Sequence, residues 1–214
     1  LIQGPPGTGK THTIGAIAIQ MLRNEPNKKV LICGTTNVSI SSLLEIVGDM
    51  VQEEGFDVCW PAASVRDFRK EDVLTKEQKL MTLYKMRNMN TPESRRFTFL
   101  YDKRFPSGRE IAEMNKLRQR LENQIIRESN VIFSTLDSSG KSTITNNISK
   151  NISALIVDEA TLSVESSLII PLSLCPDRLV LVGDHKQLGP EPSFKELADQ
   201  KYYKSMFERI IEEK

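Results

Sequence analysis

Short apolar runs and amphipathic stretches take turns along most of this chain of 214 residues. Residues 1–3 and 29–33 are mainly apolar and of strand length, and residues 10–22 between them have the spacing of a helix. The apolar side chains of that helix share one side: Ile14, Ile17, Ala18 and Met21. A strand, a helix and a second strand in this order predict a β-α-β unit.

The same alternation continues further along the chain. Residues 38–51 have apolar side chains at helical spacing, and residues 58–60 are predicted to form a brief strand. Three more apolar runs end in polar residues, at 131–134, 154–157 and 179–182, with a polar loop predicted between the first two. Such runs are typical of buried parallel strands. The sequence therefore predicts an α/β protein with a parallel sheet flanked by helices.

A charged, methionine-containing segment interrupts this alternation between about residues 65 and 129. It is predicted to be helical, and its last helix has apolar residues at near-heptad spacing, which is typical of a packing surface. That stripe consists of Ile111, Met114, Leu117, Leu121 and Ile125. We therefore predict a main domain formed by residues 1–64 and 129–214, and a helical insertion formed by residues 65–128.

The charge of the chain is uneven, although its sum is only +1. Residues 66–128 hold 16 Lys and Arg against 10 Asp and Glu, a net charge of +6, which leaves 13 against 18, or −5, elsewhere. A basic segment within an acidic protein indicates an anionic polymer as partner. On charge alone, a solvated helical face with salt-bridged pairs explains the segment equally well.

Composition bears on the compartment. No apolar run approaches the ~20 residues of a membrane-spanning helix, so no membrane partner is expected. Cys33, Cys59 and Cys175 lie far apart and the chain has 2 histidines, so neither a zinc site nor a disulfide framework is predicted. We expect a reducing compartment, the cytoplasm, with the nucleus as the alternative. Because the chain starts inside a predicted strand, we expect that an upstream segment has been removed.

The most specific chemical signal is the motif Gly-x-x-x-x-Gly-Lys-Thr between the first predicted strand and helix. Its glycines let backbone N–H groups surround an anion, and the next helix directs its positive N-terminal end to the same place. We expect Lys10 to contact the β and γ phosphates of a nucleotide and Thr11 to bind Mg²⁺. The candidate contacts to ATP or ADP are Gly4, Pro5, Pro6, Gly7, Thr8, Gly9, Lys10, Thr11 and His12.

Polar side chains also follow two later strands. Asp158 and Glu159 come directly after one, and Asp184 and Gln187 follow the next. The carboxyl ends of parallel strands meet at one edge of a sheet, where ligands bind, so we expect these residues beside Lys10. There Asp158 suits the hydration shell of Mg²⁺, and Glu159 suits taking a proton from the attacking water.

Together these motifs resemble one family. Residues 4–11, residues 158–161 (Asp-Glu-Ala-Thr) and residues 183–190 (Gly-Asp-His-Lys-Gln-Leu-Gly-Pro) are similar to motifs I, II and III of superfamily 1 helicases of the nonsense-mediated mRNA decay type. Residues 30–38 are similar to motif Ia, and residues 131–136 to the nucleic-acid-contacting motif that follows it.

The resemblance implies a P-loop NTPase with a RecA-like sheet, the first of two such domains in an ATP-driven motor on single-stranded RNA or DNA, with RNA favoured. Residues 84–90 resemble part of the helical subdomain of the decay helicase. The implied partners are the nucleic acid, the second RecA-like domain of the same parent chain, and proteins of the decay pathway.

The resemblance also implies roles for single residues. Gln187 would sense the γ-phosphate, and its catalytic partners would be Lys10 and Glu159. Thr36, Asn37 and Thr135 would touch backbone phosphates of the nucleic acid. Threonine and asparagine at such positions also serve as ordinary helix caps or loop residues, and that alternative stays open.

The chain departs from the family pattern at two places. Leu162 stands where motif II usually has a glutamine that couples hydrolysis to domain closure, although Glu165 still matches the downstream acid. Residues 34–36 (Gly-Thr-Thr) replace the usual Ala-Pro-Ser of motif Ia. Weak coupling would suit an alternative function, a nucleotide-gated clamp or scaffold on RNA. An unrelated P-loop ATPase such as an AAA+ protein is disfavoured, because Gly-Asp-x-x-Gln-Leu after a strand is a helicase arrangement.

The resemblance covers only one half of the motor. The upstream glutamine motif that recognises adenine is absent, as is the second domain that supplies arginine fingers. We therefore expect these 214 residues alone to bind ADP or ATP with Mg²⁺ weakly and to hydrolyse ATP very slowly.

Overall fold

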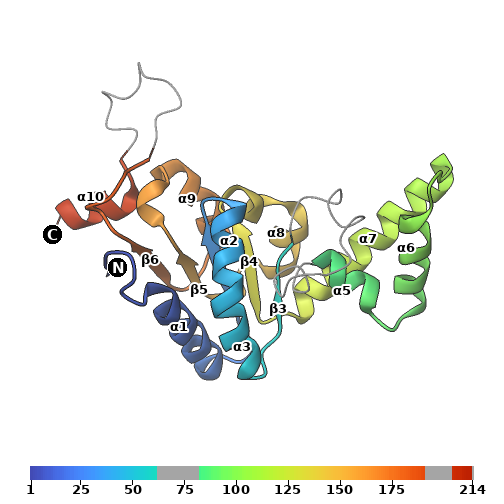
Figure 1. Ribbon diagram of the computed structural model, residues 1–214, viewed down its shortest axis with the longest axis horizontal. Coiled ribbons are helices and arrows are strands. Elements are labelled where there is room, and N and C mark those ends of the chain that lie inside the picture. The colour runs from blue at the N-terminus through green and yellow to red at the C-terminus, as the bar shows by residue number, and fades with distance from the viewer. Residues whose placement is uncertain (62–81, 191–203, 214) are drawn as a thin grey trace, which may run out of the picture.

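A computed structural model of the chain describes residues 1–61, 82–190 and 204–213. Its centre is a sheet of six parallel strands in the order β1-β6-β5-β2-β4-β3 (Figure 1). The strands are β1 (Ile2–Gln3), β2 (Lys29–Gly34), β3 (Val58–Cys59), β4 (Val131–Thr135), β5 (Ile152–Val157) and β6 (Leu179–Gly183). The α/β class and the parallel sheet predicted from the sequence are therefore confirmed.

The central strand β2 shows why both faces of the sheet are covered. All six of its residues are buried. Since side chains alternate along a strand, Val30 and Ile32 enter the apolar core on one face, whereas Leu31 and Cys33 enter the core on the other. A strand buried on both faces is the reason for the continuous apolar run in the sequence.

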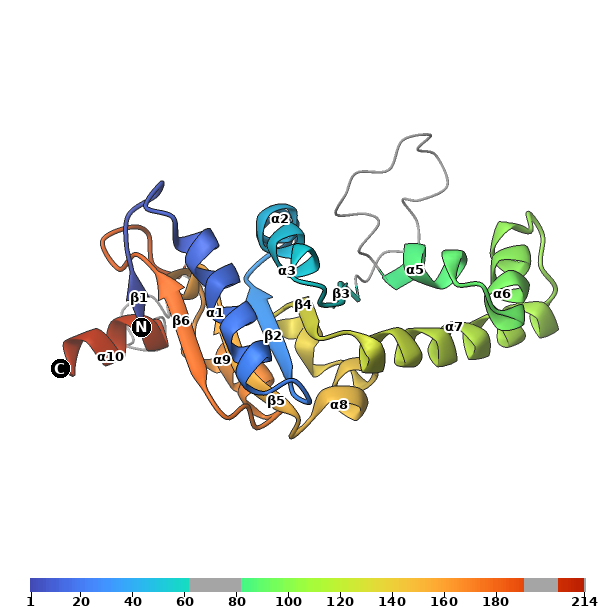
Figure 2. The same ribbon diagram turned by 90° about the horizontal axis from the view of Figure 1, so that it is seen from below.

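Helices from both halves of the chain cover the two faces (Figures 1 and 2). On one face lie α1 (Lys10–Asn24), α2 (Asn37–Leu43), the π-helical turn η1 (Leu44–Gly48) and α3 (Asp49–Glu53). On the other lie α8 (Ser142–Ile148), α9 (Glu165–Leu172) and α10 (Met206–Glu212). Two short 3₁₀ turns, η3 (Asp137–Gly140) and η4 (Ala160–Leu162), follow β4 and β5.

Two local predictions differ from the structure. The single helix predicted for residues 38–51 is interrupted by η1, which adds a residue to one helical turn. The polar loop predicted after β4 contains η3 and the helix α8, whose Ile144 and Ile148 are one helical turn apart and buried in the core. Polar side chains cover the rest of this helix, so its sequence lacks a strong apolar pattern.

The helical segment forms an arm beside the sheet (Figure 2). It comprises α5 (Thr82–Asn88), α6 (Pro92–Asp102) and α7 (Gly108–Glu128); residues 65–81 of the predicted insertion lie outside the described part. Leu117, Leu121 and Ile125 of the predicted stripe are buried, whereas Ile111 at the outer end of α7 is 42% exposed.

A buried lysine joins the root of this arm to the sheet. Lys29, the first residue of β2, donates from Nζ to the carbonyl of Arg127 over 2.7 Å and to that of Ser129. These carbonyls end α7, where a positive charge compensates the helix dipole. Burial lowers the pKa of Lys29.

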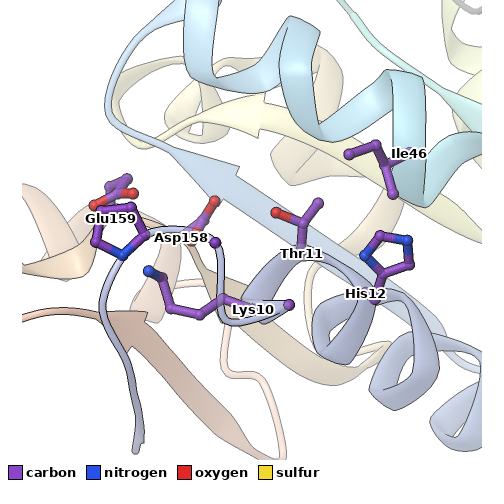
Figure 3. Close-up of a pocket in the computed structure, with 9 residues that line it drawn as sticks. Lys10, Thr11, His12, Ile46, Asp158 and Glu159 are labelled. Atoms are coloured by element: carbon purple, nitrogen blue, oxygen red, sulfur yellow. The ribbon is translucent and has the colours of Figure 1, made fainter.

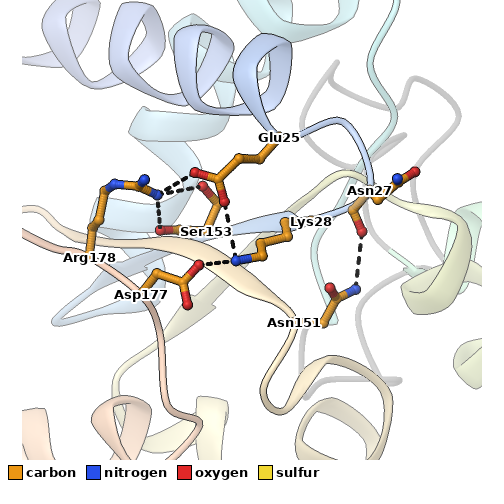
Figure 4. A network of polar contacts seen from close by, with 7 residues as sticks. All are labelled: Glu25, Asn27, Lys28, Asn151, Ser153, Asp177 and Arg178. Carbon is orange, nitrogen blue, oxygen red and sulfur yellow. Dashed lines mark hydrogen bonds and ion pairs between the residues drawn. The ribbon is translucent and has the colours of Figure 1, made fainter.

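The amino-terminal edge of the sheet is held by a polar network (Figure 4). Arg178 donates to Glu25 over 2.5 Å and to Ser153, while Lys28 pairs with Glu25 and Asp177. These contacts tie the turn between α1 and β2 to the starts of β5 and β6. The opposite, carboxyl-terminal edge carries the motif residues.

Two further observations concern the whole described chain. No helix in residues 1–61, 82–190 and 204–213 has the length and apolarity needed to cross a membrane. All three cysteines are free thiols, with Cys33 and Cys59 buried and Cys175 exposed.

Candidate functional site

The loop between β1 and α1 is shaped by two glycines in the left-handed region. Gly7 has φ 76° and Gly9 has φ 84°, values that residues with a side chain rarely adopt. Gly9 precedes α1, whose first backbone N–H groups have no side-chain cap. Uncapped N–H groups at the start of a helix of 15 residues form an anion site.

Side-chain and backbone contacts fix the loop. Lys10 reaches back over it and donates from Nζ to the carbonyls of Gly4 at 2.7 Å and Pro5 at 3.1 Å. Thr8 donates from Oγ1 to the carbonyl of Pro5 over 2.7 Å. The Gly4 N–H bonds to the carbonyl of Gly183 at the end of β6. The loop therefore holds its shape through its own atoms and the neighbouring strand.

A cavity of about 350 Å³ opens above the loop (Figure 3). Its lining brings together residues that are far apart in the sequence: Pro6, Gly7, Gly9, Lys10, Thr11, His12, Ile46, Asp158 and Glu159. Gly4, Pro5 and Thr8, also predicted as nucleotide contacts, do not line the cavity but take part in the hydrogen bonds that fix the loop. The convergence of Lys10 with Asp158 and Glu159 is the arrangement expected from the sequence.

Asp158 is placed by the backbone of β5. Its N–H donates to the carbonyl of Cys33 on β2 over 2.9 Å, which extends the strand pairing by one residue. The side chain is 9% exposed, and among the described residues its Oδ1 has no hydrogen-bond partner. Burial raises the pKa of Asp158 to about 6. A hydrogen bond from the Glu159 backbone and the charge of Lys10 oppose this rise, whereas the charge of the Glu159 carboxylate adds to it. An unpartnered, buried carboxylate oxygen is a group that a cation would stabilise.

The residues present fit magnesium. The Thr11 hydroxyl and the Asp158 carboxylate both lie on this cavity, and oxygen ligands are those that Mg²⁺ prefers. Within the described ranges, no three His, Cys, Asp or Glu side chains gather into a cage. Mg²⁺ in phosphoryl-transfer sites is held by one or two protein oxygens together with substrate phosphates and waters, so a full cage is not required.

Glu159 adopts an unusual backbone conformation. Its φ is 50° and its ψ is 40°, the left-handed region that costs a residue with a side chain about 1 kcal/mol or more. This conformation turns the chain from β5 into η4 and places the carboxylate on the cavity. Strained residues of this kind cluster at functional sites.

Asp184 and Gln187 follow the neighbouring strand, β6. Asp184 accepts a hydrogen bond from Gln187 Nε2 at 2.8 Å and from the Lys186 N–H at 3.1 Å. The bond from Gln187 is the largest cause of the lowered pKa of Asp184, and Lys10 lowers it further. Gln187 thus lies at the expected edge of the sheet, but its amide is engaged by Asp184 and it does not line the cavity.

The predicted nucleic-acid contacts lie at the ends of β2 and β4, which pair at Gly34 and Thr135. Thr36 caps α2 by accepting from the Ser39 N–H at 3.1 Å, and Ser39 returns the contact. Thr135 Oγ1 accepts from the Ser138 N–H at 3.2 Å. Asn37 is exposed at the first position of α2. Both threonines therefore hydrogen-bond to the local backbone as cap or turn residues, which is the alternative that the sequence left open.

Two features near the site were missed by sequence analysis. Ile46 lines the cavity from η1, yet it lies off the buried apolar stripe of that helix, and an aliphatic side chain carries no chemical signature. Arg209 on α10 forms a two-pronged ion pair with Glu165, at 2.9 and 2.6 Å, just beyond motif II. Leu162, which replaces the usual glutamine, is 41% exposed.

Comparison with known proteins gives a consistent result. A family described as "AAA domain" matches residues 1–59 and 63–191 of this chain. The chain is 32% identical over 215 residues to "Regulator of nonsense transcripts 1 homolog" of Neurospora crassa, covering 99% of this chain and 18% of that protein. It is 33% identical over 221 residues to "ATP-dependent helicase upf1" of Schizosaccharomyces pombe, covering 99% of this chain and 22% of that protein.

A relative with a different printed role shares the same stretch. "DNA polymerase alpha-associated DNA helicase A" of Schizosaccharomyces pombe is 30% identical over 233 residues, covering 99% of this chain and 32% of that protein. The chain thus spans between 18% and 32% of the length of these three relatives. The family description names an AAA domain, and two of these three relatives are named helicases.

Proposed function

Because this chain belongs to the AAA-domain family, as a superfamily 1 helicase domain of the regulator of nonsense transcripts type, we propose that it is the first motor half of an ATP-dependent helicase or translocase. The observation that carries this proposal is the shared cavity of Lys10, Thr11, Asp158 and Glu159. The first two come from a glycine-rich loop and the last two from the end of a distant strand.

The chemistry of this site divides among those four residues. Lys10 would neutralise the β and γ phosphates of ATP, exchanging its contacts to loop carbonyls for phosphate oxygens. Thr11 and Asp158 would hold magnesium, which when bound gathers charge on the phosphates. Glu159 would orient the attacking water and accept its proton. ATP and Mg²⁺ are therefore the proposed cofactors.

Gln187 is proposed as the sensor of the γ-phosphate. Its amide donates to Asp184, and Asp184 lies close enough to Lys10 for the lysine charge to lower its pKa. A change in the position of Lys10 would therefore be felt by Asp184 and its partner. The hydrogen bond from Gln187 to Asp184 would thus link the phosphates to the residues that follow β6.

We propose single-stranded nucleic acid as the track, with RNA favoured. Thr36, Asn37 and Thr135 would contact its backbone, since they lie at adjacent strand ends on the ligand-binding edge of the sheet. The basic insertion would add phosphate contacts. Further proposed partners are a second RecA-like domain of the parent protein and proteins of the decay pathway, and the proposed compartment is the cytoplasm or the nucleus.

A second candidate function is a nucleotide-gated RNA clamp. Leu162 favours it, because this exposed aliphatic side chain cannot make the hydrogen bonds of the glutamine that the family usually has there. A clamp would bind ATP and RNA, but RNA would barely change the rate of hydrolysis.

The test measures ATP hydrolysis by the full-length protein with and without single-stranded RNA. For a motor, RNA stimulates hydrolysis several-fold, and single-stranded DNA serves as the comparison. Glu159→Gln should lower the rate about a hundredfold or more while ATP still binds. Lys10→Ala should weaken ATP binding about ten- to hundredfold, because a charged hydrogen-bond donor is lost.

Lys116→Ala is the matched control, since Lys116 is an exposed lysine on α7, away from the cavity. It should leave ATP binding unchanged. ATP hydrolysis that survives both site substitutions would overturn the proposed function. Hydrolysis that depends on the site but ignores RNA would select the clamp.

A further inference from the structure

The nucleotide cavity has two chemically different ends (Figure 3). Lys10, Asp158 and Glu159 lie on one side, and Thr11 lies between them and the other side. The far side is formed by His12 of α1 and Ile46 of η1. The charged groups are therefore confined to one end, and the other end presents an imidazole and an aliphatic side chain.

Ile46 lies on the exposed side of the π-helical turn. Leu44, Val47 and Gly48 of this turn are buried, whereas Ile46 is 37% exposed and faces the cavity. The buried stripe through Leu43, Leu44 and Val47 keeps helical spacing, and Ile46 lies off it. Such π turns occur frequently at functional sites.

Close packing of α1 brings this turn to the cavity. Gly15 of α1 has no side chain, and a Cβ there would lie 2.7 Å from Sδ of Met50 on α3. The two helical segments can therefore approach closely, which sets His12 and Ile46 on the same cavity. An aliphatic side chain held at the mouth of a polar cavity suits an uncharged, flat part of a ligand.

We infer that His12 and Ile46 form the surface that contacts the nucleoside half of the bound nucleotide. This inference rests on the proposed function and adds the direction in which the nucleotide lies. Lys10 of this motif reaches the β and γ phosphates, so the terminal phosphate lies at the end with Asp158 and Glu159. The sugar and base then extend past Thr11 towards Ile46.

The chemistry of this surface also sets its selectivity. Ile46 cannot make hydrogen bonds, and His12 offers only its ring nitrogens. Apolar contact and ring stacking are tolerant of the identity of the base. We therefore expect this surface to favour nucleotides over bare polyphosphate, but to distinguish little among the four bases.

The experiment compares two ligands on the full-length protein by calorimetry. One is ATP with Mg²⁺, and the other is inorganic tripolyphosphate with Mg²⁺, which has the phosphates without a nucleoside. Ile46→Ala should weaken ATP binding roughly three- to tenfold, because some tens of Å² of apolar contact are lost. Its affinity for tripolyphosphate should stay within about twofold. His12→Ala should act in the same direction.

Ile169→Ala is the matched control, because Ile169 is an exposed isoleucine (60%) on α9 that does not line the cavity. It should change neither affinity. Ile46→Thr, which keeps a branched side chain, guards against a folding defect and should weaken ATP selectively as well. The Ile46 variants should lose affinity for GTP and UTP as they do for ATP, while their affinity for tripolyphosphate is kept.

Different failures have different meanings. Equal weakening of ATP and tripolyphosphate by Ile46→Ala would overturn this inference alone, since Ile46 would then merely support the phosphate loop. Unchanged affinity for both ligands in the Ile46 and His12 variants would overturn it too. If the unsubstituted protein bound neither ligand, the proposed function would fall and this inference with it.

Discussion

Glu110 is an acidic residue outside the nucleotide cavity whose ionisation the structure clearly perturbs. It accepts a hydrogen bond from Lys103 Nζ at 2.6 Å and from the Ser107 N–H at 2.8 Å, in a capping box at the start of α7. The contact with Lys103, followed by those with Ser107, lowers the pKa of Glu110 from 4.5 to about 2. The carboxylate therefore stabilises the folded state at and above pH 4.5, and this contribution disappears as the pH falls towards 2.

We expect the carboxyl carbon of Glu110 to titrate with a midpoint near pH 2 in an NMR experiment on the folded protein. Lys103→Met should move that midpoint up towards 4.5, because the largest of the three hydrogen-bonding causes is removed. A midpoint near 4.5 in the unsubstituted protein would show that the cap does not form in solution.

Single residues of the site differ in how far the sequence could predict them. Lys10 and Thr11 belong to a motif with a fixed spacing, and Asp158 directly follows an apolar run, so chemistry and position point the same way. Ile46 had no such signal. Its place on the cavity depends on how α1 packs against the segment of η1 and α3, which is a property of the packed structure.

At the scale of elements, the ion pairs of the arm separate two roles for its basic residues. Arg96 pairs with Glu113 at 2.8 Å and Lys103 with Glu110 at 2.6 Å, and both pairs join α6 to α7. Arg95 and Arg104 are exposed and form no ion pair with any residue in the described ranges. The interpretation as salt-bridged pairs thus applies to Arg96 and Lys103. The interpretation as nucleic-acid contacts remains for Arg95 and Arg104.

We therefore expect Arg95→Glu with Arg104→Glu to weaken binding of single-stranded RNA and to make its salt dependence shallower by about one unit of slope per lost phosphate contact. The melting temperature of this double variant should stay unchanged. Arg96→Glu with Lys103→Glu is the comparison, and it should lower the melting temperature because it places like charges together between α6 and α7. Unchanged RNA binding in the first pair would assign the arm to packing.

The elements themselves were predicted where one physical signal dominated. β2, β5 and β6 were predicted correctly because strands covered by helices on both faces are mainly apolar. Helix α8 was missed, since only Ile144 and Ile148 bury against the core and polar residues fill the rest. The π turn was missed as well, because residues 38–51 satisfy the spacing of a regular helix and packing decides otherwise.

At the scale of the whole molecule, the cavity has a loop on one side and two acidic residues on another, but no arginine of the described residues lines it. In phosphoryl-transfer sites an arginine supplied from elsewhere contributes about 10³ to 10⁵ in rate. We expect residues 1–214 alone to hydrolyse ATP about 10³-fold or more slowly than the full-length protein with RNA. Steady-state assays at matched protein concentration measure this, and rapid unwinding by the shorter chain would contradict it.

The hydrogen bonds from Lys29 to the last carbonyls of α7 have a mechanical consequence. Its ammonium group anchors the arm at the first residue of β2, and the far end of this same strand runs into Thr36. Because β2 is paired on both sides, it resists stretching and bending. It would therefore transmit a displacement of the helical arm to the edge of the sheet where the nucleic-acid contacts are proposed. Because the Cys33 carbonyl of this same strand accepts the hydrogen bond from the Asp158 N–H, tilting the arm would displace the proposed nucleic-acid contacts and the acidic side of the nucleotide cavity together.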